Sequence, residues 1–223
     1  MSGSGFQFDA SQPYQLEAIA SVVDLFNGQP RDAEKLATTL RGAAVLPDSD
    51  RAALDIDLTQ EVGAVGNSLV LDRDLILANL QRVQDRNGLE VAPALAGDAL
   101  DFDIEMETGT GKTYVYLRTI FDLAVRYNFT KFVILVPSVA IREGVSTSIR
   151  LMREHFESLY KPQGITFDAS IYSGKSAEEV QSFATSTNVQ ILIMTIDSIR
   201  GNANTRIIHQ TRDKLNGCLL YTS

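Results

Sequence analysis

Residues 101–195 alternate between two patterns of apolar positions. Short runs that are apolar almost throughout predict buried strands, whereas longer stretches repeat apolar residues at helical spacing. The expected strands span residues 132–136, 166–172 and 189–194. The expected helices include one that ends near residue 127 and two that span residues 139–160 and 176–184. Strands that alternate with helices and read as apolar runs indicate a parallel sheet covered on both faces, so the sequence predicts an α/β fold.

The first hundred residues follow a looser pattern. Helical spacing predicts a helix over residues 11–26, with Pro13 in its first turn, and a second helix over residues 72–86 that Asp72 caps. A weaker helical pattern covers residues 31–41. We expect these helices to belong to an N-terminal extension rather than to the alternating strand and helix units that follow.

Alternating apolar and polar positions mark two further segments. A small hairpin is expected within residues 54–71, where glycine and asparagine separate two alternating runs. The same alternation predicts a short strand over residues 102–106 that leads into a glycine-rich loop. We therefore expect residues 1–100 to form a mixed N-terminal extension that packs on an α/β domain over residues 101–223.

Charge and composition narrow the function classes only slightly. The net charge of −8 and the pI of about 4.8 argue against a broad basic face for nucleic acid. Backbone amides and a few placed side chains also hold phosphates, so DNA binding stays open. No apolar run approaches the roughly 18–20 residues that span a bilayer, so no membrane contact is expected. Cys218 is the one cysteine, which excludes an intrachain disulfide, and a cytoplasmic location is the simplest expectation.

A glycine-rich turn follows the strand expected over residues 102–106. Its residues are Thr108, Gly109, Thr110, Gly111, Lys112 and Thr113. Glycines let successive backbone N–H groups point inward around phosphates, and the following helix adds the positive end of its dipole. Lys112 is expected to reach the β- and γ-phosphates, and the Thr113 hydroxyl to take one position on Mg²⁺. Met106 stands where the general pattern has glycine, which weakens the motif when it is taken alone.

Three further segments resemble motifs of superfamily 2 helicases. Residues 13–19 look like the glutamine motif, in which Gln15 would bind the adenine edge of ATP. Residues 136–144 and 194–198 sit where helicase motifs Ia and Ib should. Residues 104–117 closely resemble the restriction subunit of type III restriction-modification enzymes. In that family a methionine before the Glu-Thr-Gly-Thr-Gly-Lys-Thr run is usual, so the departure from the general pattern becomes support.

The resemblance implies a RecA-like P-loop NTPase domain that binds ATP with Mg²⁺ and works in a translocase or helicase on duplex DNA. It also implies a second RecA-like domain, a C-terminal nuclease domain and a partner modification subunit, which is a methyltransferase. The family's acidic Walker B motif should follow a strand after residue 215, and residues 217–223 fit the family poorly. We therefore expect a truncated piece that binds nucleotide weakly and hydrolyses essentially none.

Three side chains are candidates for contacts with the DNA backbone. Ser138 and Arg142 follow one expected strand, and Thr195 follows another. Each also has a plain structural interpretation. Ser138 and Thr195 suit helix capping, and Arg142 suits an ion pair with Glu143 or Glu154.

Two other functions stay open at this point. One is a superfamily 2 helicase that acts on RNA or on repair intermediates. The other is a non-catalytic nucleotide-binding module that docks partner proteins through residues 31–100. Residues 140–144 favour the restriction enzyme over the other superfamily 2 helicases.

Overall fold

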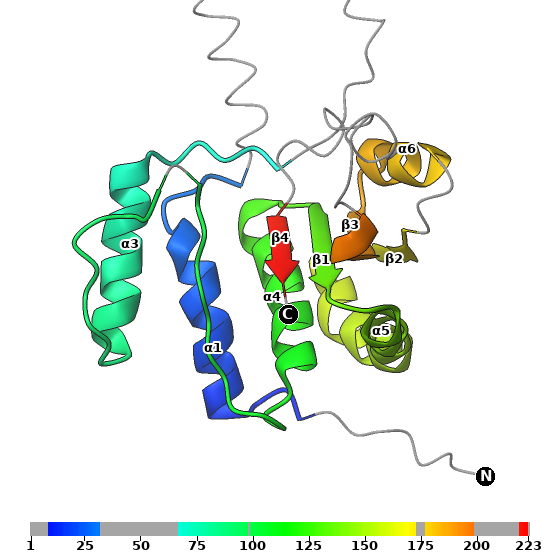
Figure 1. The fold of residues 1–223 in the computed structure, drawn as a ribbon, viewed down its shortest axis with the longest axis horizontal. Helices are drawn as coiled ribbons and strands as arrows, with labels where there is room; N and C mark the ends of the chain where they lie inside the picture. Colours follow the sequence, from blue (N-terminus) through cyan, green and yellow to red (C-terminus); the bar gives the residue numbers. More distant parts are fainter. Residues whose placement is uncertain (1–8, 32–66, 98, 173–176, 199–218, 223) are drawn as a thin grey trace, which may run out of the picture.

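The computed structural model describes residues 9–31, 67–97, 99–172, 177–198 and 219–222 (Figure 1). Its helices are α1 (Pro13–Val23), α3 (Arg73–Arg86), α4 (Lys112–Tyr127), α5 (Val139–Tyr160) and α6 (Ala177–Thr185). Single 3₁₀ turns are η1 (Asp24–Phe26), η2 (Lys161–Gln163) and η3 (Ile196–Ser198). The strands are β1 (Lys131–Val136), β2 (Phe167–Ile171), β3 (Val189–Thr195) and β4 (Leu219–Thr222). The helices and strands expected between residues 112 and 195 are all present, to within about one residue.

The four strands form one parallel sheet in the order β2-β3-β1-β4. β1 and β3 are buried along their whole length, as their apolar runs predict. Successive side chains of β1 point to opposite faces of the sheet. Phe132, Ile134 and Val136 share a core with α4 and α5, whereas Val133 and Leu135 share a second core with α6. Helices therefore cover both faces, which confirms the predicted α/β fold.

The segment before residue 100 packs on α4 through α1 and η1, and α3 packs on η1 in turn (Figure 1). Val23 and Phe26 belong to the same hydrophobic core as the buried side of α4. The Tyr127 hydroxyl at the end of α4 donates to the Val23 carbonyl at 3.1 Å. Asn79 of α3 donates to the Leu25 carbonyl at 2.9 Å. The helices expected over residues 11–26 and 72–86 are thus confirmed, and the domain division at residue 100 stays a prediction.

The strand expected over residues 102–106 is wrong. The segment is extended and passes in front of α1 in the view of Figure 1, but it is not a strand. Phe102 and Met106 pack against the core, but Ile104, which alternation places on the same side, is 39% exposed, so the alternation describes the burial of only two of the three residues. A strand also needs a neighbouring backbone to complete a ladder. Among the described residues, no backbone hydrogen bond joins this segment to another strand.

The expected hairpin is not found in the part of its range that the structure describes. Residues 54–66 lie outside the described residues, as does nearly all of the helix expected over 31–41, and residues 68–71 are extended but form no strand. A side chain takes the place of the partner strand here. The Gln29 amide nitrogen donates to the Ser68 carbonyl at 2.6 Å, and its oxygen accepts from the Val70 N–H at 3.1 Å.

Candidate nucleotide site

The turn before α4 is built by two glycines in left-handed conformations. Gly109 has φ 84° and Gly111 has φ 84° and ψ 36°, a region that costs other residues roughly 1–2 kcal/mol. A Cβ added to Gly109 would meet no atom of the described residues within 4 Å, so there the backbone conformation alone favours glycine. At Gly111 the Cβ would lie 2.7 Å from the Gln15 amide nitrogen, so the Gln15 side chain would also have to move.

The start of α4 presents backbone N–H groups toward the loop. Gly111 is the N-cap residue, and among the described residues no side chain caps the helix. The bond from the Val115 N–H to the Gly111 carbonyl at 3.1 Å is the first of the helix, so the N–H groups of Lys112 and Thr113 make no bond within it. Lys112 is exposed on this turn and Thr113 is half-buried. Free amides, a helix dipole and an exposed ammonium group fit a bound triphosphate, and the Thr113 hydroxyl fits one position on Mg²⁺.

The rest of the loop supports this conformation. The Thr110 hydroxyl donates to the Glu107 carbonyl at 2.7 Å and so closes the turn from within. Thr108 and Gly109 are exposed. In Figure 1 the loop enters α4 at the end of the sheet toward which the arrowhead of β1 points. Ligands of open parallel sheets bind at this carboxyl edge of the strands.

Gln15 contacts the loop directly. It lies in the first turn of α1, and only 9% of it is exposed. Its amide nitrogen donates to the Thr110 carbonyl at 2.9 Å. Gln15 is therefore not a polar residue on the helix surface, and its contact with adenine stays a prediction. Tyr14 beside it is 48% exposed.

The residues expected to contact DNA lie near one another at the same sheet edge. Val136 and Thr195 are aligned across β1 and β3, so the ends of these two strands are neighbours. Ser138 begins α5 just beyond β1, and Arg142 follows on the first turns of that helix. The structure therefore brings Ser138, Arg142 and Thr195 to the carboxyl edge, where the loop also lies.

Each of these three side chains already has a partner within the protein. The Ser138 hydroxyl accepts from the Ile141 N–H at 3.3 Å and caps α5. Arg142 pairs with Glu143 at 2.9 Å, and the Thr195 hydroxyl lies 2.9 Å from the Ser198 hydroxyl. The structural interpretations of Ser138 and Arg142 are thus present, whereas the Thr195 hydroxyl bonds a side chain rather than a helix N–H. Contacts of all three residues with DNA stay a prediction.

A polar network between α4 and α5 escaped the sequence analysis. The Tyr114 hydroxyl lies 3.1 Å from His155 Nε2, and the Tyr160 hydroxyl donates to Asp122 at 2.5 Å. Arg118 stands between these two pairs, 3.5 Å from the Tyr114 hydroxyl. Burial raises the pKa of Asp122 and of Tyr160, and it lowers the pKa of His155. The one sequence signal was the four-residue spacing that places Tyr114, Arg118 and Asp122 on one face of α4.

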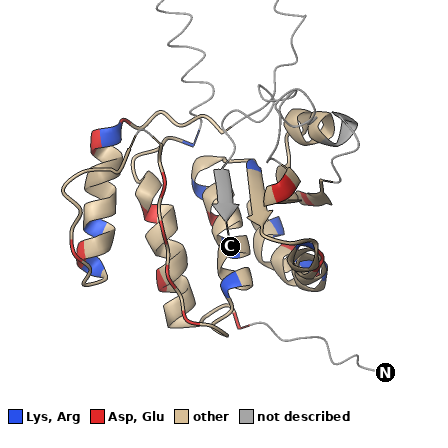
Figure 2. Ribbon diagram, in the orientation of Figure 1, with Lys and Arg blue, Asp and Glu red and all other residues tan. Residues whose placement is uncertain are grey.

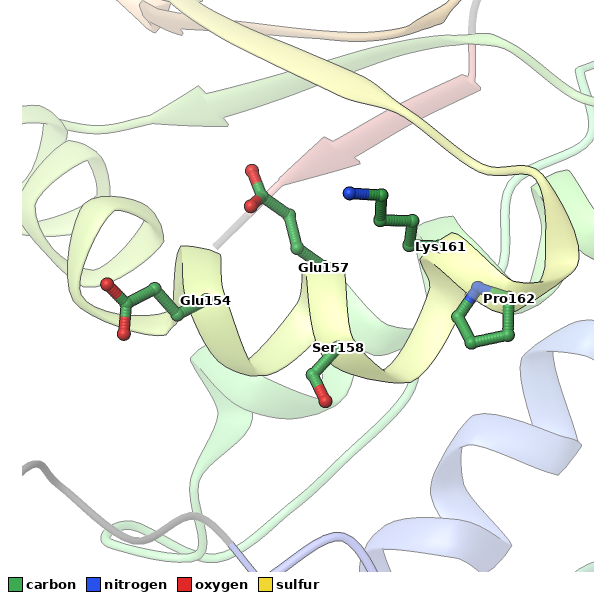
Figure 3. A pocket seen from close by; sticks show the side chains of 5 residues that line it. All are labelled: Glu154, Glu157, Ser158, Lys161 and Pro162. Carbon is green, nitrogen blue, oxygen red and sulfur yellow. The ribbon is translucent and has the colours of Figure 1, made fainter.

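A wide depression of about 510 Å³ lies elsewhere, on the outer side of α5 (Figure 3). Its lining includes Glu154, Glu157 and Lys161, near the end of the helix opposite Ser138. Figure 3 shows Glu157 and Lys161 rising from the same side of the helix. Two carboxylates disfavour a phosphate ligand, and the position is remote from the carboxyl edge of the strands. We assign this depression no part in the nucleotide site.

Charges of both signs are mixed on the outer helices. Figure 2 shows basic and acidic residues interspersed along α3 and α5. This distribution agrees with the expectation that any DNA contact uses a few placed groups rather than a broad basic face. No helix in the described ranges has both the length and the apolar character that a membrane crossing requires.

The parallel sheet, the helices on both of its faces and the glycine-rich turn before α4 define a P-loop NTPase domain of the RecA-like kind. Family membership follows from the sequence match. A family model described as type III restriction enzyme, res subunit, matches residues 10–220, and the chain belongs to this family.

Three relatives, all of them Res subunits of type III restriction-modification enzymes, agree with this assignment. The Res subunit of EcoPI from Escherichia phage P1 is 28% identical over 179 residues, or 78% of the chain. The Res subunit of EcoP15I from Escherichia coli is 25% identical over 94% of the chain. The Res subunit of StyLTI from Salmonella typhimurium is 46% identical over 66 residues, or 29% of the chain. The matched parts cover 16%, 20% and 7% of these relatives, so the chain spans about a fifth of their length or less.

Proposed function

We propose that the chain is the ATP-binding part of a DNA translocase subunit in a type III restriction enzyme. ATP hydrolysis would drive movement along duplex DNA, and a nuclease domain elsewhere in the protein would cleave it. The observation that carries the proposal is the uncapped start of α4, with Gly109, Gly111 and Lys112 at the carboxyl edge of a parallel sheet. The relatives are Res subunits of type III restriction-modification enzymes, which supports the restriction setting. A partner modification subunit with methyltransferase activity follows from that setting.

Each loop residue has a role that its position supports. The backbone N–H groups of residues 108–113 would hold the phosphates, and the Lys112 ammonium group would neutralise charge on the β- and γ-phosphates. The Thr113 hydroxyl would hold Mg²⁺, which would offset the charge that develops during phosphoryl transfer. Gln15 reads the adenine edge, because a carboxamide both donates and accepts hydrogen bonds.

The DNA contacts require a change of partners. Ser138, Arg142 and Thr195 bond within the protein in this structure. A phosphate at the carboxyl edge would compete with Glu143 for Arg142, and it would receive the Ser138 and Thr195 hydroxyls as donors. We propose that these three residues hold the DNA backbone.

Nucleotide binding tests the proposal most simply. Titration of a fluorescent ATP analogue with Mg²⁺ into the 223-residue chain should give saturable binding. Lys112→Ala should weaken that binding at least about tenfold, which corresponds to ~1.4 kcal/mol. Lys161→Ala, at the depression on α5, is the matched control and should leave it unchanged. Equal affinity of the Lys112→Ala variant and the parent chain would contradict the proposal.

Nucleotide binding without turnover is a second candidate for the chain taken alone. Phosphoryl transfer needs a positioned metal and a positioned water, which acidic side chains after a strand supply. Within the described residues, β3 is followed by the single carboxylate of Asp197, and no acidic residue directly follows β1. We expect essentially no phosphate release by the 223-residue chain with or without duplex DNA. DNA-stimulated release well above that of Lys112→Ala would exclude this candidate.

A further inference from the structure

Arg118 connects the phosphate-loop helix to the turn that begins α1. It follows Lys112 on α4 by six residues, about 9 Å along the helix axis. Its Nη1 donates to the Ala10 carbonyl at 2.5 Å. Ala10 belongs to a compact turn in which the Asp9 carboxylate accepts from the Ser11 N–H at 2.8 Å and from the Gln12 amide at 2.7 Å. The guanidinium group therefore holds the turn from which α1 starts.

Arg118 also connects to α5, through Tyr114 of its own helix. Nη1 also lies 3.5 Å from the Tyr114 hydroxyl, which in turn meets His155 of α5 at 3.1 Å. The Tyr114 ring stacks on the Phe156 ring, with centroids 5.5 Å apart. Arg118 thus stands where three elements meet, namely the turn before α1, α4 itself and α5. A guanidinium group suits such a junction because its donors point in fixed directions.

The placement of Gln15 leaves little room for movement. Its amide nitrogen bonds the Thr110 carbonyl at 2.9 Å and fills the space where a Cβ on Gly111 would stand. A group that reads a base must be held to within roughly 0.5 Å. Apolar contacts of Ile19 and Val23 fasten α1 to the core, but burial of apolar surface has no direction. The bond from Arg118 to Ala10 is a directional restraint at the end of α1 that carries Gln15.

We infer that Arg118 is a positioning residue for base recognition: it holds the turn at Ala10 against α4 and thereby sets the Gln15 carboxamide over the loop. The inference rests on the proposed function and adds to it the residue on which selection of ATP over GTP depends. Arg118 touches neither the phosphates nor the base in this account. Its removal should therefore change selectivity for the base more than the grip on the phosphates.

The chain contains a matched control for this inference. Arg126 lies on the same helix and also ties α4 to the N-terminal segment, through an ion pair with Asp24 at 2.9 Å. That contact is at the end of α4 away from Gln15. Substitution of Arg126 removes a comparable link without touching the start of α1.

The experiment measures dissociation constants for ATP and GTP by competition against a fluorescent ATP analogue, for the 223-residue chain and its variants. Thermal unfolding of each variant is recorded alongside. We expect Gln15→Ala to abolish the preference for ATP. Arg118→Met should reduce that preference by about tenfold, or to the level of the Gln15→Ala variant. Arg118→Lys keeps the charge and should retain part of the preference, whereas Arg126→Met should retain all of it. The double variant of Gln15→Ala with Arg118→Met should lose no more than Gln15→Ala alone.

Other results would distinguish failure of the inference about Arg118 from failure of the proposed function. If Arg118→Met and Arg118→Lys lower only the unfolding temperature and keep the parent's ratio of ATP to GTP affinity, Arg118 is structural and the inference is wrong. The proposed function survives that result, because binding would still depend on Lys112 and selectivity on Gln15. If the parent chain shows no binding that depends on Lys112, or no preference for ATP, the inference falls, and loss of Lys112-dependent binding also removes the proposed function. Should Arg118→Met fail to fold, Arg118→Lys provides the measurement.

Discussion

The first turn of α4 differs from the packed part of the helix that follows it. Beyond its first turn the helix is packed on several sides, with buried residues such as Leu117, Phe121 and Ala124. Its first turn leaves Lys112 exposed and its backbone donors without a cap. The packed part supplies free energy of folding, whereas the N–H groups of Lys112 and Thr113 make no bond within the helix. The proposed phosphate site therefore lies beside the packed part of the same helix.

The largest expected effect on stability comes from a substitution in the packed part of α4. Phe121 is 1% exposed, and its ring lies 4.8–5.1 Å from the rings of Phe156, Tyr160 and Phe167. Phe121→Ala should lower the free energy of unfolding by about 3–5 kcal/mol, measured by denaturant titration. Lys112→Ala should change it by less than about 0.5 kcal/mol. Similar losses of unfolding free energy in the two variants would contradict the distinction between the first turn and the packed part of α4.

The two glycines of the loop sharpen the comparison. Gly109→Ala should cost about 1–2 kcal/mol of stability from backbone strain alone. Gly111→Ala should cost more, because its Cβ would meet the Gln15 amide at 2.7 Å. Adding Gln15→Ala should recover part of the loss at Gly111 and none at Gly109, as read from thermal unfolding midpoints. Equal behaviour of the two sites would mean that Gln15 does not restrict the space above Gly111.

A smaller effect separates capping from DNA contact at Ser138. Aspartate at this position keeps the capping acceptor for the Ile141 N–H and suits the helix dipole, so Ser138→Asp should change stability by less than about 0.5 kcal/mol. Its negative charge should nevertheless weaken binding of duplex DNA several-fold at low salt, measured by fluorescence anisotropy. Ser138→Asn, which caps without charge, is the control. Unchanged DNA affinity in both variants would leave capping as the sole role of Ser138.

The smallest expected effect is a pH dependence at His155. Burial, with a lesser contribution from the charge of Arg118, lowers the pKa of His155 from its ordinary value of 6.5. The unfolded chain therefore binds this proton more readily than the folded chain does, and acid favours unfolding. Stability should fall as the pH drops from about 6.5 toward the lower folded-state pKa. His155→Gln should flatten that part of the pH profile of the unfolding midpoint, and an unaltered slope would refute the assignment.

The sequence predicts the parts of the fold that depend on local pattern. β1, β3 and α5 were expected almost residue for residue, because runs of Val, Ile and Leu and a long helical repeat leave few alternatives. The error at residues 102–106 arises because alternation reports a half-buried extended chain, while a strand depends on a distant partner. The loop was predicted from spacing alone, since glycine conformations and the helix start are local.

The contacts around the loop were harder to predict. Gln15 and Thr110, which share a hydrogen bond, are 95 residues apart in the chain. Arg118 and Ala10 are 108 apart, and neither residue belongs to a pattern with known chemistry. His155 is half-buried against Tyr114, a contact that no pattern in the sequence indicates. Such contacts depend on how whole helices pack, which single-sequence periodicity does not encode.

A crystal structure of the chain with a non-hydrolysable ATP analogue and Mg²⁺ tests the central claim most directly. The account predicts the triphosphate within hydrogen-bonding distance of the backbone amides of residues 109–113, with the Lys112 ammonium group on the outer phosphates. It also predicts Mg²⁺ on the Thr113 hydroxyl. A nucleotide bound at the depression on α5, or a loop that stays empty at saturating analogue, would contradict it.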